Sequence, residues 1–104
     1  MSKIFYENLV TLTKIEKLIK DSSMTSLERE ELWKIVEEIL HHRIMGCVLD
    51  SLPSEHHDEF LAKLANDPRD EGLIDYLEEK TGTKISEKIR QEIVAIEEEI
   101  LKDL

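Results

Sequence analysis

The strongest constraint on the fold is a line of aliphatic residues in the last fifth of the sequence. These side chains recur three or four positions apart, at Ile85, Ile89, Ile93, Ile96, Ile100 and Leu104. Because an α-helix completes one turn in about 3.6 residues, side chains at this spacing lie on one face of a helix. The pattern predicts a long amphipathic helix from about Lys84 onward, with Val94 and Leu101 widening its apolar face.

The same spacing and several helix-terminal signals predict four further helices. Thr25 and Glu28 have the spacing of a capping box, and Pro53 and Pro68 each fit the first turn of a helix. Gly82 provides a left-handed end for the fourth helix. We predict an all-α fold of about five helices in a compact orthogonal or bundle-like array, forming a single domain over residues 1–104. The four upstream helices are expected over about Ser2–Lys20, about Ser26–Asp50, from Pro53 onward, and from Asp67 to Thr81.

The expected second helix changes its apolar face partway along its length. One stripe contains Leu32, Ile35, Val36, Ile39 and Leu40, whereas Ile44, Met45, Val48 and Leu52 cluster on roughly the opposite side. A helix buried on two faces must contact two different bodies. Either other helices of this chain cover both stripes, or a second chain covers one of them.

Composition and charge narrow the classes of partner. The formal net charge is −10 at pH 7, and the 14 Lys and Arg residues are scattered. Nucleic acids and anionic membranes are recognised by clustered basic residues, so we expect neither as a partner. Cys47 is the only cysteine, the first ten residues do not resemble a signal peptide, and the apolar runs are short. We therefore expect a cytoplasmic protein that does not cross a membrane.

Two histidine pairs raise the alternative of a metal site. Glu38 and His41 are three positions apart, as are His56 and Glu59 in the reverse order. Di-iron helical bundles use two Glu-x-x-His motifs and two further glutamates, and this sequence has the motif once in that order. We interpret the histidines instead as half-buried residues at the margins of helix packing.

The sequence contains no pattern that predicts catalysis. Cys47 and His42 lie about 140° apart around one helix, so they cannot form a nucleophile–base pair there. The sequence also lacks a nucleophile elbow, a phosphate-binding glycine loop and a dinucleotide-binding fingerprint. We expect no enzymatic activity, no catalytic residues and no cofactor.

Three segments resemble a family of short, acidic, all-helical proteins from candidate-phylum bacteria that is described as a domain of unknown function. The segments are "RIMGCVL" at 43–49, "LPSEHHDEF" at 52–60 and "YLEEK" at 76–80. The resemblance covers roughly residues 25–104, and the first 24 residues are less typical. It implies a helical fold and no particular activity or binding residue.

Two functions follow from the residue patterns. The first is a non-enzymatic interaction module that self-associates or binds a protein partner through an apolar helix face. Its expected contact residues are Val48 and Leu52 at the end of the second helix and Val94 and Ile100 in the last helix. The alternative is a metal-binding helical protein that uses Glu38, His41, His56 and Glu59.

Overall fold

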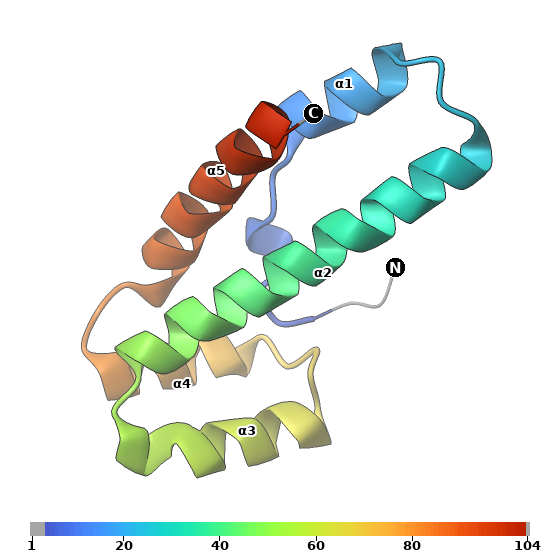
Figure 1. Cartoon of the computed structure of the whole chain (residues 1–104). Coiled ribbons are helices and arrows are strands. Elements are labelled where there is room, and N and C mark those ends of the chain that lie inside the picture. Colours follow the sequence, from blue (N-terminus) through green and yellow to red (C-terminus); the bar gives the residue numbers. More distant parts are fainter. Residues whose placement is uncertain (1–3, 104) are drawn as a thin grey trace.

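The computed structural model describes residues 4–103, and between them it contains five α-helices, two short 3-10 turns and no strand (Figure 1). The all-α prediction is therefore confirmed. The helices are α1 (Thr13–Asp21), α2 (Ser26–Ser51), α3 (His57–Asn66), α4 (Gly72–Thr81) and α5 (Ile85–Asp103), and the turns are η1 (Glu7–Leu9) and η2 (Ser54–His56).

The centre of the fold is the antiparallel pair of α2 and α5 (Figure 1). The apolar face of α5 is buried as the sequence predicts, through the four side chains of Ile85, Ile89, Ile93 and Ile96. Burying an aliphatic side chain of this size contributes about 1.5–3 kcal/mol, so this pair dominates the core. The α3–α4 pair lies at one end of it and α1 at the other, which gives an elongated molecule of 47 × 24 × 18 Å.

The buried residues of α2 form one continuous line that winds around the helix. They recur every four positions, at Val36, Leu40, Ile44, Val48 and Leu52. Four residues span slightly more than one turn, so each step advances the line by about 40° and the whole line by about 160°. The apparent change of face is thus a gradual rotation, and the chain's own segments cover it throughout.

The prediction for the N-terminal half of α2 is wrong at two positions. Ile35 and Ile39, expected in the same buried stripe as Val36 and Leu40, are exposed. They lie on the flank of the winding line, about 100° and about 60° from Val36.

The helix ends follow the sequence signals at two places. The Thr25 hydroxyl oxygen accepts the backbone N–H of Glu28 at 3.2 Å, and the Glu28 carboxylate accepts that of Thr25 at 3.3 Å. This is the predicted capping box at the start of α2. At the C-terminal end of α4, Gly82 adopts a φ of 67°, the left-handed conformation that glycine reaches without strain.

The prediction of one helix over Ser2–Lys20 is wrong in its first half. Residues 4–12 form a turn, η1 and irregular backbone, and the α-helix begins only at Thr13. The backbone N–H of Phe5 donates to the Pro68 carbonyl at 2.7 Å, and the Phe5 ring packs edge-on against Phe60. Tertiary contacts therefore override the helical spacing of this segment.

The fourth helix also begins later than the sequence predicts. Asp67 and Pro68, expected as its cap and first residue, form a turn in which the Asp67 carboxylate accepts the Arg69 N–H at 3.1 Å. The Asp70 carboxylate then accepts the Gly72 N–H at 2.9 Å, where α4 starts. The Pro68 carbonyl is used by Phe5 instead of a helical partner.

A buried glutamate of α5 fixes the start of α1. No side chain at the N-cap position of α1, Leu12, satisfies the free N–H groups of this helix. The Glu97 carboxylate accepts the Ile15 N–H at 3.3 Å, although Glu97 is only 7% exposed. A carboxylate at a helix N-terminus satisfies free amides and interacts favourably with the helix dipole. Glu97 thereby links α5 to α1 through a hydrogen bond between residues 82 positions apart in the chain.

We predict that Glu97→Ala lowers the free energy of unfolding by about 1–3 kcal/mol, because the buried Ile15 N–H loses its acceptor. Glu97→Gln keeps an acceptor oxygen and should cost less. Glu98→Ala, at the exposed neighbouring position, is the control, and urea unfolding measures all three. Equal losses in Glu97→Ala and Glu98→Ala would show that this bond does not hold α1.

Candidate interaction surface

One flank of α2 presents an exposed line of residues with coiled-coil spacing. We call this line the outer seam: Leu32, Ile35, Ile39, His42, Gly46 and Leu49. Its positions alternate three and four residues apart, which is the spacing of the contact positions in paired helices. Ile35 is 53% exposed and Ile39 37% exposed, whereas Leu32 and Leu49 at the two ends are half-buried. The four central positions are thus open to a partner.

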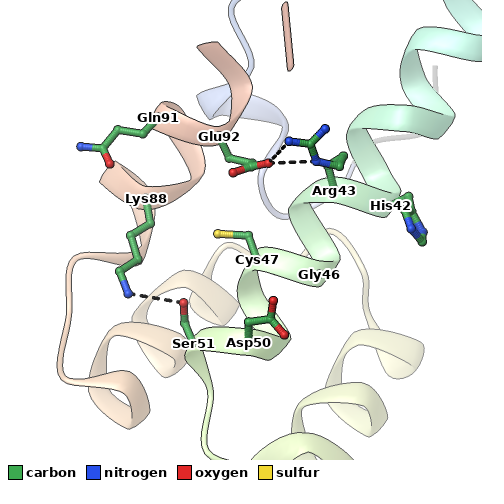
Figure 2. A pocket seen from close by; sticks show the side chains of 9 residues that line it. All are labelled: His42, Arg43, Gly46, Cys47, Asp50, Ser51, Lys88, Gln91 and Glu92. Carbon is green, nitrogen blue, oxygen red and sulfur yellow. Dashed lines mark hydrogen bonds and ion pairs between the residues drawn. The ribbon is translucent and has the colours of Figure 1, made fainter. Parts of the chain in front are cut away.

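A groove lies beside the C-terminal half of the outer seam, between α2 and α5 (Figure 2). Its volume is about 540 Å³, and we call it the Gly46 groove. A Cβ atom added at Gly46 would meet no heavy atom within 4 Å, so the missing side chain leaves open space. The lining residues are His42, Arg43, Gly46, Cys47, Asp50 and Ser51 of α2, and Lys88, Gln91 and Glu92 of α5.

Arg43 fixes the two walls of the groove relative to each other. Its guanidinium donates to Glu92 through Nε at 3.0 Å and Nη2 at 2.7 Å, and to Glu99 through Nη1 at 2.5 Å. Both carboxylates belong to α5 and lie about two turns apart, so a single side chain of α2 sets the register of the helix pair (Figure 2 shows the Glu92 contacts). The hydrogen bond from Arg43, followed by its positive charge, lowers the pKa of Glu99 below its ordinary value.

Cys47 points from α2 toward α5 inside the groove (Figure 2). Partial burial, followed by the charge of Glu92, raises the pKa of its thiol above the ordinary value. The thiolate is the nucleophilic form, so this environment is the opposite of one that activates a cysteine. His42 points away from Cys47, as the helical geometry predicts.

Two of the four predicted contact residues lie in the core. Val48 is 0% exposed and Leu52 3% exposed, so both belong to the buried line of α2 and neither is available to a partner. That expectation is wrong because the winding line keeps the end of α2 in contact with this chain. In α5, Ile100 is half-buried against the core, whereas Val94 is 55% exposed.

The four residues of the metal alternative do not come together. Within the described part of the chain, no group of three or more His, Cys, Asp or Glu side chains could hold a metal ion. The Nδ1 atom of His41 shares a hydrogen bond with the Tyr6 hydroxyl at 3.2 Å, and His56 lies 3.6 Å from the carboxylate of Glu55. Glu38 and Glu59 are exposed.

The histidines only partly match the expected half-buried packing positions. His56 and His57 are half-buried, and His57 Nε2 donates to the Leu52 carbonyl at 2.7 Å, which satisfies the end of α2. His41 and His42 are exposed, so the expectation is wrong for this pair. His42 instead occupies a central position of the outer seam.

Comparison with known proteins adds no relative: no protein-family model, curated protein or solved structure matches this chain. The resemblance of residues 25–104 to the candidate-phylum family therefore stays a prediction. From residue 4 to residue 103, no helix combines the length and apolar character that crossing a membrane requires.

We predict that the contribution of Arg43 to stability depends on pH. The pKa of Glu99 is lower in the folded protein than its ordinary value of 4.5, so the pair contributes fully above that pH. Its contribution should decline as pH falls through the folded pKa. Thermal unfolding of wild type and Arg43→Gln should show a difference in melting temperature at pH about 7 that narrows toward pH about 3.

The control for this measurement is Arg90→Gln, which removes an exposed arginine from the same helix pair. Its difference from wild type should vary less with pH than that of Arg43→Gln. A constant difference between wild type and Arg43→Gln over the whole pH range would show that the Glu99 pair makes no folded-state contribution.

Proposed function

We propose that this chain is a non-enzymatic protein-interaction module that binds a partner helix through the outer seam of α2. The observation that supports this function is the exposure of two isoleucines, Ile35 and Ile39, one turn apart in the middle of α2. Apart from Leu27 in its first turn, the other large aliphatic residues of this helix are buried or half-buried. Helices that bind other helices present apolar anchors at this spacing.

The adjoining groove supports the same function. A partner helix laid along the outer seam would meet two projecting isoleucines and then the open space at Gly46. Knobs-into-holes packing places the projecting side chains of one helix into hollows on the other, and this surface offers both. The residues that line the groove are mostly polar or charged, so beside the isoleucines the groove would supply the polar rim of a protein interface.

Composition supports the wider setting of this proposal. The net charge of −10 disfavours nucleic acid and anionic lipid as partners, and a single cysteine suits a reducing compartment. We place the module in the cytoplasm. No catalytic role is proposed, since the raised pKa of Cys47 and the direction of His42 do not provide an activated nucleophile.

A photo-crosslinking amino acid at position 35 tests this function in cells that naturally produce the chain. We expect a covalent adduct of defined mass, because a bound helix would cover Ile35. The matched control is the same amino acid at Leu61 of α3, a leucine of similar exposure outside the seam.

The adduct should disappear when Ile39→Glu is added, because a buried carboxylate in the seam would weaken the contact. Circular dichroism checks that this variant stays folded, as expected for a side chain that is already exposed. Equal crosslinking from positions 35 and 61, or adducts that survive Ile39→Glu, would contradict the proposed function.

A further inference from the structure

We propose that the occupant of the outer seam is a second copy of this chain, with the two α2 helices antiparallel across a two-fold axis. This inference rests on the proposed function and adds the identity and geometry of the partner. It follows from the order of side chains along the seam together with the position of the Gly46 groove.

The outer seam is complementary to its own reverse. A two-fold axis between Ile39 and His42 places Leu32 opposite Leu49 of the second copy, Ile35 opposite Gly46, and Ile39 opposite His42. Ile35 and Ile39 then face a smaller and an amphipathic residue respectively, and the half-buried leucines pair with each other at the two ends. Such a contact is isologous, because residue i meets residue j in both directions.

The open space at Gly46 accounts for the most exposed aliphatic residue of the seam, Ile35. Ile35 of one copy would enter the space that the absent Gly46 side chain leaves on the other. The Ile35 side chain would cover the backbone at Gly46 and lose contact with water, whereas on the isolated chain it is more than half exposed. The same exchange occurs twice in the dimer, once on each side of the axis.

The absence of charge along the seam also favours self-association. Charged residues make up 37% of the sequence, yet none of the six seam positions is Asp, Glu, Lys or Arg. Two chains of net charge −10 repel each other, so a self-contact requires a surface free of carboxylates at its centre. The seam provides such a surface along α2.

The first test is the mass of the purified full-length chain by sedimentation equilibrium up to roughly millimolar concentration. We expect a dimer, and Ile35→Glu should raise its dissociation constant by about 30-fold or more. Val94→Glu is the matched control, because Val94 has the same exposure as Ile35 to within a few per cent but lies on α5. Its dissociation constant should stay within about twofold of wild type.

The second test reads the register through disulfides in a Cys47→Ser background. Chains carrying Ile35→Cys are mixed with chains carrying Gly46→Cys and oxidised. The two positions are eleven residues, or about 16 Å, apart along one helix, so they cannot bond within a chain. The antiparallel contact brings them together across the axis, and a disulfide-linked heterodimer should dominate over either linked homodimer.

Each outcome separates the identity of the partner from the proposed function. A wild-type chain that stays monomeric overturns the second-copy proposal, while a position-35 adduct with another protein would leave the proposed function standing. Linked 35–35 and 46–46 homodimers would indicate parallel helices and overturn the antiparallel geometry. A dimer that is lost in Val94→Glu and kept in Ile35→Glu would show that the outer seam of α2 is not the contact between the two copies.

Discussion

Packing of α2 against α5 determines where every other segment of this chain lies. The isoleucine face of α5 covers one side of α2, and the Arg43 guanidinium holds the two helices in register through Glu92 and Glu99. The remaining segments complete the core at its ends. Glu97 attaches α1 to α5, and the Pro68 carbonyl attaches the N-terminal segment through Phe5.

The length of α2 then gives this helix two separate lines of residues. Its buried line advances every four positions and therefore rotates around the helix, so that it follows α5 and ends over the α3–α4 pair. Its outer seam advances by three and four positions in alternation and stays nearly straight. The residues of the buried line pack into the core of this chain, whereas Ile35 and Ile39 of the outer seam are exposed to solvent.

The sequence was sufficient to predict helices whose ends and faces are set locally. Thr25, Gly82 and the isoleucines of α5 act through their own neighbourhood, and the structure agrees with each. The errors occur where contacts distant in sequence decide. The segment before Thr13 is held by Pro68, and no local pattern distinguishes it from the helix that follows.

Contacts between residues distant in sequence also explain why the sequence did not identify the exposed surface of α2. An apolar stripe that includes both Ile35 and Val36 is wide enough for either residue to be buried, and only the position of α5 decides which one is. The sequence predicts Val48 and Leu52 at a surface because the rotation of a line with a four-residue step resembles a change from one helix face to another. The signal for the outer seam is present in the sequence, as an alternating three- and four-residue spacing that includes a glycine, but it overlaps the core stripe.

The central claim is that α2 uses one line for its own core and a second line for a copy of itself. Isotope-filtered nuclear Overhauser spectroscopy on a mixture of labelled and unlabelled chains tests it most directly. The account predicts intermolecular cross-peaks between the Ile35 methyl groups and the α-protons of Gly46. Cross-peaks from Ile35 confined to its own chain, or intermolecular cross-peaks that involve Val94 instead, would contradict it.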